Sequence, residues 1–369
     1  MTYIHERAKW PDLTWDAGQL AEKLMLVRHK QGYLLGRLSA LGFDIQTEAV
    51  LKTLTTDIIK SNEIEGEYLD PDQVRSSLAK RLGIDDAGLP AASRHIDGIV
   101  EMMLDATQQC QQALTADRLF GWHHLLFPTG RSGMRQITIA NWRTADAGPM
   151  QVVSGPIGRE KVHYEAPSAK RLVEEMSAFL DWFNHEEGVD PIIKAGAAHF
   201  WFVTIHPFED GNGRIARAIA DLCLTRADGV PQRFYSMSAS IECARKQYYE
   251  ILEHTQGGGL NITAWLQWFL DCLLDAIEQA DVTLEKVLAK AAIFERLSKH
   301  NINDRQRKML NLLFGNFQGK LSTSKYAKIA KCSHDTALRD IQVLIDYSVL
   351  EKDPASGSGR GTRYVLVSR

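Results

Sequence analysis

The sequence predicts a mainly α-helical protein, and three observations support this. Leu, Ile, Met and Ala recur at three- and four-residue spacing through most of the 369 residues, as in Leu20, Leu24 and Val27. Only between residues 130 and 165 do Gly, Pro and alternating apolar residues replace this period. With 44% hydrophobic residues, the chain can bury more than one core, so two or three units are expected.

Composition argues against several classes of protein. The chain has no run of about 18 apolar residues and no basic N-terminal stretch followed by an apolar one, so we expect neither a membrane span nor a signal peptide. A cytoplasmic protein is therefore expected. The five cysteines lack CxxC spacing, which favours reduced thiols over a disulfide framework or a zinc site.

Helical periodicity places the elements along the chain. Helices are expected at 16–42, 46–65, 71–81, 91–114, 116–126, 167–187, 189–205, 212–227, 241–255 and 260–298. In the exceptional stretch, we expect a β-hairpin with Met150 and Val152 in one strand and Val162 and Tyr164 in the other, around the turn-rich SGPIGRE. A solvated loop is the alternative.

A unit of different composition begins at residue 304. Residues 304–369 carry twelve Lys or Arg against six Asp or Glu, a net charge of +6, whereas the chain as a whole has −3. Two short helices divided by CSHD resemble a helix-turn-helix, with Ser333 as the N-cap of the second. A closing hairpin around 357–361 would make this unit a winged helix-turn-helix.

The segment HPFEDGNGRIAR, residues 206–217, has the groups needed to hold and transfer a phosphate-linked group. Gly211, Asn212 and Gly213 lead into a helix whose first N–H groups lie at the positive end of its dipole, where anions bind. The glycines leave room for a phosphate to approach these amides. Arg214 and Arg217 follow one helical turn apart and could hold a polyphosphate.

Two more residues of this segment suggest chemistry. Asp210 offers the hard oxygen ligand that holds Mg²⁺ against phosphates, although an acid at a helix N-terminus is the plainer interpretation. His206 is the natural general base, because its ordinary pKa lies near neutrality. Phe208 is expected to anchor the turn, Glu209 to face water, and His199 to lie in the core. A zinc hydrolase and a Walker-type ATPase are poor alternatives, because their motifs are absent.

At every defining position this segment resembles the HPFx(D/E)GNGRxxR motif of Fic-domain proteins, and the resemblance extends over about 115–275. It implies a mainly α fold, the Fic helical fold with a β-hairpin flap, here followed by the winged helix-turn-helix. It also implies a protein adenylyltransferase that moves AMP from ATP to a Tyr, Thr or Ser hydroxyl of a target protein and releases pyrophosphate. His206 would be the base and Asp210 the Mg²⁺ ligand. The implied nucleotide-binding residues are Gly211, Asn212, Gly213, Arg214 and Arg217.

Two further groups of residues take their roles from this resemblance. The hairpin corresponds to the flap that docks target side chains, here Met150, Gln151, Val152, Val153, Val162 and Tyr164; an exposed strand edge can pair with any extended peptide. Downstream, Tyr248 or Tyr249 could pack on the adenine ring, and core packing accounts equally well for both.

The segment SNEIEG suggests a built-in inhibitor. Ser61 and Glu65 lie four residues apart on one face of a helix, with Gly66 as its C′ residue. On spacing alone Glu65 is a surface acid, but SNEIEG resembles the (S/T)xxxE(G/N) inhibitory motif of Fic proteins. That resemblance implies an ion pair between Glu65 and Arg217 and an autoinhibited enzyme. The expected domains are an N-terminal helical region, 1–114, with the inhibitory helix at 46–66, the Fic catalytic domain, 115–298, and the winged helix, 304–369.

Other functions stay open. Residues 304–369 could bind DNA in a regulator, with Arg339 and His334 as base readers and a core of Leu338, Ile341, Leu344 and Ile345. A Fic enzyme could instead remove AMP or use another nucleotide. The expected partners are ATP and a protein with a hydroxyl side chain, which could be this chain itself. DNA and a homo-oligomer are left open, and no membrane partner is expected.

Overall fold

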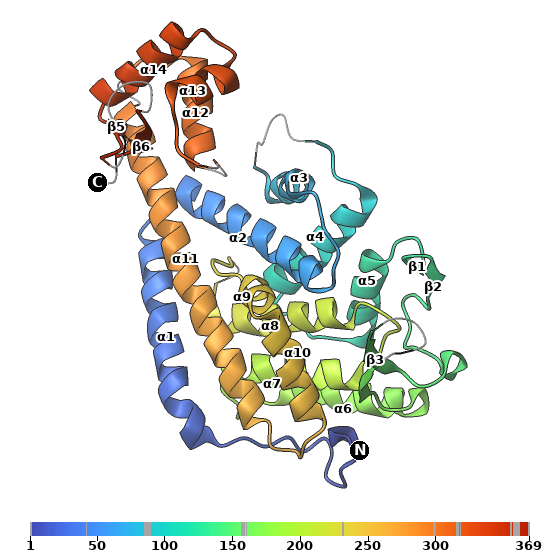
Figure 1. Cartoon of the computed structure of the whole chain (residues 1–369). Coiled ribbons are helices and arrows are strands. Elements are labelled where there is room, and N and C mark those ends of the chain that lie inside the picture. The colour runs from blue at the N-terminus through green and yellow to red at the C-terminus, as the bar shows by residue number, and fades with distance from the viewer. Residues whose placement is uncertain are drawn as a thin grey trace. The chain divides into compact units, whose positions relative to one another are not determined.

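The chain is mainly helical, as expected, and its described residues form two compact units, Met1–Asp281 and Val282–Arg369 (Figure 1). The boundary lies inside the long helix α11, Thr263–Leu297; the predicted division into three domains stays a prediction. Within the described residues, every helix is too short or too polar to serve as a membrane span. The computed structural model describes residues 2–41, 43–84, 90–155, 159, 161–230, 232–297, 300–314, 317, 319–354, 356 and 362–367.

The helices of the first unit follow the predicted periodicity. Besides α11 they are η1 Ile4–Glu6, α1 Ala17–Ser39, α2 Phe43–Ile64, α3 Pro71–Leu82, α4 Arg94–Gln108, α5 Ala116–Leu126, η2 Ala145–Ala147, η3 Ala169–Arg171, α6 Leu172–His185, α7 Pro191–Ile205, α8 Asn212–Asp228, α9 Met237–Cys243 and α10 Arg245–Gln256. The prediction of one helix at 241–255 was wrong, because Ser236 caps an earlier start and the helix breaks at Ala244. The predicted helix 91–114 is shorter, since it begins after the N-cap Ser93 and ends at Gln108.

The stretch from 130 to 165 forms the expected hairpin rather than a solvated loop. Strand β3, Gln151–Ser154, pairs antiparallel with β4, Lys161–Glu165, with an irregularity between Val152 and Val153. Part of the predicted turn, 156–158 and 160, lies outside the described residues. A second small pair, β1 Arg131–Ser132 and β2 Arg135–Gln136, precedes it.

Helices α7 and α8 form the centre of the first unit and pack closely against each other (Figure 1). Nearly all of α7 is buried, and Asp190 caps it while Pro191 starts it. Gly196 lets α11 approach, because a Cβ there would meet the ring of Phe269 at 3.0 Å. The loop between α7 and α8 is thus held by two buried helices.

The described residues of the second unit form further helices and a strand pair: α12 Asp304–Phe314, α13 Thr323–Ala330, α14 His334–Asp346, β5 Leu350–Lys352 and β6 Tyr364–Leu366. As predicted, Ser333 caps α14. Ile341 and Leu344 lie in the core, but the prediction for Leu338 was wrong: it is 45% exposed, because it lies beside the buried stripe of α14. Ile345 is partly buried.

Two predictions for this unit are not tested. The proposed tip of the closing hairpin, 357–361, lies outside the described residues. Assignment as a winged helix and DNA binding therefore both stay predictions.

Candidate active site

The predicted motif forms the connection between α7 and α8, and its own residues hold it rigid. His206 caps α7 in the left-handed region, with φ 52°, and its N–H donates to the Phe202 carbonyl at 3.0 Å. The Asn212 side chain accepts from the Phe208 N–H at 2.9 Å and donates to the Phe208 carbonyl at 2.8 Å. Phe208 is fully buried and stacks on His123, so it anchors the turn as expected.

The start of α8 is left available to an anion. The first N–H groups of a helix have no intrahelical partner, and the N-cap of α8, Gly211, has no side chain that could accept from them. The side chain of Asn212 is buried and bonds to both main-chain groups of Phe208, so its backbone is the part that could contact a phosphate. These amides fit the predicted phosphate cradle.

Gly211 is the position where only glycine fits. Its φ is +81°, and a Cβ would lie 2.9 Å from the ring of Phe127. We expect Gly211→Ala to lower the free energy of unfolding by about 1–3 kcal/mol, because the left-handed backbone and the close contact both become unfavourable. Urea denaturation measures this. Gly36→Ala is the control, since its site in α1 is open and the change should stabilise by about 0.5–1 kcal/mol; equal effects would contradict the account.

His206 has the tautomer that a general base needs. Its Nδ1 lies 3.1 Å from the carbonyl oxygen of Val203. Because a carbonyl only accepts, Nδ1 must carry the hydrogen, and the lone pair is on Nε2. Burial lowers the pKa of His206, so the ring is neutral near pH 7. The half-buried imidazole can therefore take a proton at Nε2.

Asp210 is suited to hold a divalent cation against phosphate oxygens. One carboxylate oxygen accepts from the Gly211 N–H at 2.6 Å, the other bonds to the hydroxyl of Ser132, and the side chain is 41% exposed. The described residues contain no group of three or more His, Cys, Asp or Glu that could form a complete metal site. One accessible carboxylate beside a phosphate cradle is what Mg²⁺ commonly uses, because it keeps water and phosphate ligands.

The prediction that Glu209 faces water was wrong. Its carboxylate accepts from the hydroxyl of Thr138 at 2.7 Å and pairs with Arg135 at 3.0 Å. The side chain is almost buried, since the segment that precedes the hairpin folds over the motif. Glu209 thus ties that segment to the loop.

The structure contains the predicted pair between Glu65 and Arg217. Arg217 is 2% exposed, and its Nη2 lies 2.7 Å from the Glu65 carboxylate. Its Nε and Nη2 also donate to the hydroxyl and carbonyl of Ser61, at 2.9 and 2.8 Å. Gly66 adopts the left-handed conformation expected after α2, with φ 82°. Whether this contact inhibits the protein stays a prediction.

Arg214 also has a carboxylate partner, which the sequence did not single out. Its Nη1 donates to Glu67 at 2.8 Å, and the other oxygen of Glu67 lies 2.5 Å from Nε2 of His95. The bond to His95 and the charge of Arg214 lower the pKa of Glu67. In the sequence, the hint to this partner was that a second acid, Glu67, follows two residues after Glu65. Both motif arginines are therefore paired with acids from the segment after α2.

The two candidate adenine contacts are not equivalent. Tyr248 is buried, and its hydroxyl lies 2.9 Å from Nε2 of His199. Tyr248 therefore follows the core-packing alternative, because α10 turns it into the core, where His199 lies as expected. Tyr249 is exposed, donates to the Ile64 carbonyl at 3.3 Å, and remains a candidate.

The flap presents only some of its predicted residues. Val153 and Val162 face each other across the hairpin and are 47% and 41% exposed, and Gln151 is also exposed; Met150 and Val152 are half-buried. Tyr164 was wrong as a docking residue. It is buried because Tyr3 and His5 cover the base of the hairpin, and its hydroxyl donates to the carbonyl of Thr204.

Nothing in the sequence marked Arg143 as part of the site. This buried arginine donates from Nε to the carbonyl of His206 at 2.8 Å. It comes from the irregular segment NWRTADAG, far from the motif in sequence. No motif or periodicity could have revealed this contact.

The architecture and the site together define a class: a helical protein with an uncapped helix N-terminus, a neutral histidine and a hairpin beside them. Residues 113–224 match the model of the Fic/DOC family, so this part of the chain is a Fic/DOC family domain. Residues 3–84 match a domain of unknown function (DUF4172). The expected resemblance is thereby confirmed for the domain that carries the motif.

Curated relatives and solved structures agree with this assignment. The chain is 30% identical over 129 residues to protein adenylyltransferase fic-1 of Caenorhabditis elegans, which covers 34% of this chain and 23% of that protein. It is 32% identical over 132 residues to protein adenylyltransferase Fic of Nematostella vectensis, which covers 35% and 27%. The chain thus spans about a quarter of the length of these relatives. A Fic family protein from Desulfovibrio desulfuricans G20 shares the fold, with a TM-score of 0.52 at 20% identity over 94% of this chain and 96% of that one.

Proposed function

We propose that this chain is a protein adenylyltransferase, which moves AMP from ATP to a hydroxyl side chain of a protein and releases pyrophosphate. The observation that carries the proposal is the arrangement of His206, with an unprotonated Nε2, beside the uncapped N-terminus of α8. The names of the curated relatives support the same activity. The test is mass spectrometry of the protein after incubation with Mg²⁺ and ATP, using a variant that lacks the Glu65 carboxylate.

The proposed reaction uses the groups of the loop in defined roles. The oxygen of the target hydroxyl attacks the α-phosphorus of ATP, and its proton passes to Nε2 of His206. The bond from the α-phosphorus to the bridging oxygen breaks, and pyrophosphate leaves. The first N–H groups of α8 hold the phosphates, and Arg214 and Arg217 neutralise the outer ones once their carboxylate partners are displaced.

We further propose that Asp210 holds Mg²⁺, which would supply positive charge to the phosphates of ATP. We expect Asp210→Asn to raise the Mg²⁺ concentration needed for half-maximal AMP transfer by about tenfold or more, since a charged ligand contact of about 1.5–3 kcal/mol is lost. A Mg²⁺ titration of labelled-AMP incorporation measures this. Asp181→Asn is the control, because Asp181 lies exposed on α6 and pairs only with His185 among the described contacts. An unchanged Mg²⁺ requirement in Asp210→Asn would remove the metal from this site.

We also propose that the protein is autoinhibited as it stands. The carboxylate of Glu65 occupies the space over Gly213, where even a Cβ would overlap it. It pairs with Arg217 while Glu67 pairs with Arg214. Two anionic side chains therefore lie where the outer phosphates of ATP would bind, and a nucleotide must displace them to be held for transfer.

The protein target would be held in extended form by the flap. Its outer surface carries the exposed Val153 and Val162, and two-stranded hairpins have open edges that can pair with a peptide backbone. Lys161 and His163 of β4 both contact Glu253 of α10, which connects the flap to the rest of the domain. This mode of docking would recognise an exposed loop more than a particular sequence.

A further inference from the structure

Arg143 closes the C-terminal end of α7 directly behind His206. Its Nε donates to the carbonyl of His206 at 2.8 Å, its backbone N–H to that of Pro207 at 2.9 Å, and its Nη2 to that of Pro167 at 2.5 Å. The last carbonyls of a helix lack intrahelical donors and lie at the negative end of its dipole. A buried guanidinium supplies both a hydrogen-bond donor for such a carbonyl and a positive charge at the negative end of the dipole.

The conformation of His206 depends on this closure. A φ of 52° is unfavourable for a residue with a side chain and persists only where its surroundings enforce it. The ring is directed by its bond to Val203 inside the same turn, so its direction follows the main chain at 206. Arg143 holds this main chain at two successive carbonyls: its side chain bonds to that of His206 and its backbone N–H to that of Pro207.

We propose that Arg143 is a positioning residue for the general base: it fixes the left-handed turn at His206 and so directs Nε2 toward the target hydroxyl. The inference rests on the proposed function, in which His206 is that base. It adds a residue from outside the motif, one that bonds to the main chain of the loop through its side chain and its backbone.

The positive charge of Arg143 also favours the neutral form of His206, which is the form that a general base needs. The charged groups that face His206 are Arg143, Glu65 and Asp210. Burial is the main cause of the lowered pKa of His206; Arg143 lowers it further, and the two acids raise it. Burial also lowers the pKa of Arg143, to about 10, which leaves it charged at neutral pH. Loss of Arg143 should therefore raise the pKa of His206, so that the neutral base forms only at higher pH.

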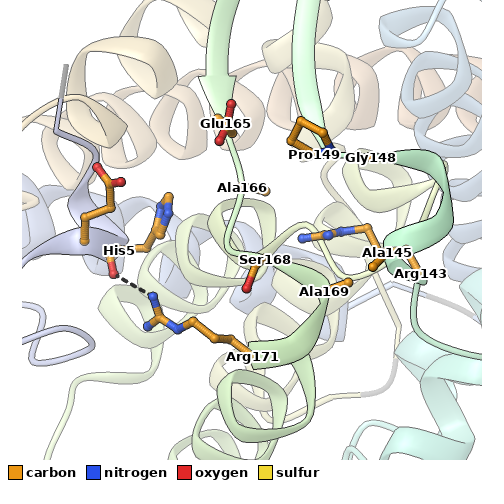
Figure 2. Close-up of a pocket in the computed structure, with 11 residues that line it drawn as sticks. His5, Arg143, Ala145, Gly148, Pro149, Glu165, Ala166, Ser168, Ala169 and Arg171 are labelled. Atoms are coloured by element: carbon orange, nitrogen blue, oxygen red, sulfur yellow. Dashed lines mark hydrogen bonds between the residues drawn. The ribbon is translucent and has the colours of Figure 1, made fainter.

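A cavity gives experimental access to this position. Arg143 lines a cavity of about 420 Å³, and Figure 2 shows it among the other lining residues near the end of β4. The same cavity is lined by Glu6, Ser168 and Arg171, which are exposed at its mouth. A guanidinium ion could thus enter from solvent and replace the side-chain group in a variant that lacks it.

The test compares Arg143→Ala with Arg143→Lys. We expect Arg143→Ala to lower kcat for AMP transfer by about a hundredfold, as for a misplaced catalytic group, with little change in KM for ATP. Guanidinium chloride at millimolar concentration, far below denaturing levels, should restore a large part of the rate. Arg143→Lys should keep the pH midpoint of wild type but recover only part of the rate, because an ammonium cannot span the carbonyls of His206 and Pro167 as the guanidinium does.

A second readout does not need the transfer reaction. Diethyl pyrocarbonate modifies neutral imidazole, and mass spectrometry of the His206 peptide gives its pH midpoint, which should be higher in Arg143→Ala than in wild type. Arg171→Ala is the control, since it opens the same cavity without touching the His206 carbonyl. An unchanged midpoint together with no guanidinium rescue would overturn the inference. If wild type transfers no AMP while the midpoint still shifts, the proposed function fails, and only the electrostatic effect of Arg143 on His206 stands.

Discussion

Replacement of His206 by alanine is expected to lower AMP transfer by about a hundred- to ten-thousand-fold, the usual contribution of a general base. The reason is specific to this imidazole. Its Nδ1 hydrogen is committed to the Val203 carbonyl and burial keeps the ring neutral, so Nε2 is free to accept the proton of the attacking hydroxyl. Initial rates of labelled-AMP incorporation measure the effect.

Two further variants make this result interpretable. His206→Asn tests whether the fold tolerates the change, because asparagine adopts the left-handed conformation more readily than alanine. It should be as inactive as His206→Ala while unfolding at nearly the wild-type urea concentration. His185→Ala, at an exposed position on α6, should keep full activity. Substantial transfer by His206→Asn would mean that another group takes the proton.

Replacement of Glu65 by alanine is expected to raise ATP affinity and AMP transfer by about tenfold to a hundredfold. The contact between its carboxylate and Arg217 is charge-assisted and nearly buried, and such bonds contribute about 1.5–3 kcal/mol. Without it, Arg217 is free to hold an outer phosphate and the space over Gly213 is open. Fluorescent-nucleotide binding and labelled-AMP incorporation together check both effects.

The same change should cost stability. Arg217 is buried and would lose its carboxylate, and breaking a buried pair costs up to about 3–5 kcal/mol; the remaining bonds to Ser61 and the partial exposure of Glu65 reduce that cost. Glu63→Ala is the matched control, because Glu63 lies two residues away and pairs with Lys60. Equal, low labelling by wild type and Glu65→Ala would argue against autoinhibition. Glu67 still holds Arg214 in Glu65→Ala. If this second pair also inhibits, a variant that carries both Glu65→Ala and Glu67→Ala should be more active than Glu65→Ala alone.

The sequence was sufficient where function is local. The residues from His206 to Arg217 are contiguous, so one loop and one helix start set their geometry, as the sequence predicted; the roles assigned to them stay predictions. The contact between Glu65 and Arg217 was also predicted, but only through resemblance to a known motif. Helices were placed well because amphipathic periodicity reflects burial on one face.

Predictions failed where distant segments decide burial. The N-terminal turn covers Tyr164, and the segment after β2 covers Glu209. Arg143 and Glu67 were missed because each acts through a partner that is remote in sequence. Alternation and spacing describe a segment by itself, and such contacts arise only once the segments pack together.

The central claim is that the loop between α7 and α8 grips a triphosphate so that AMP, rather than the terminal phosphate, is transferred under the control of His206. The most direct measurement incubates the Glu65→Ala protein with a protein extract, Mg²⁺ and ATP labelled at either the α- or the γ-phosphate, beside the same protein that also carries His206→Ala. We predict protein-bound label from the α position only, and none without His206. Label from the γ position, or α label that persists without His206, would contradict the account.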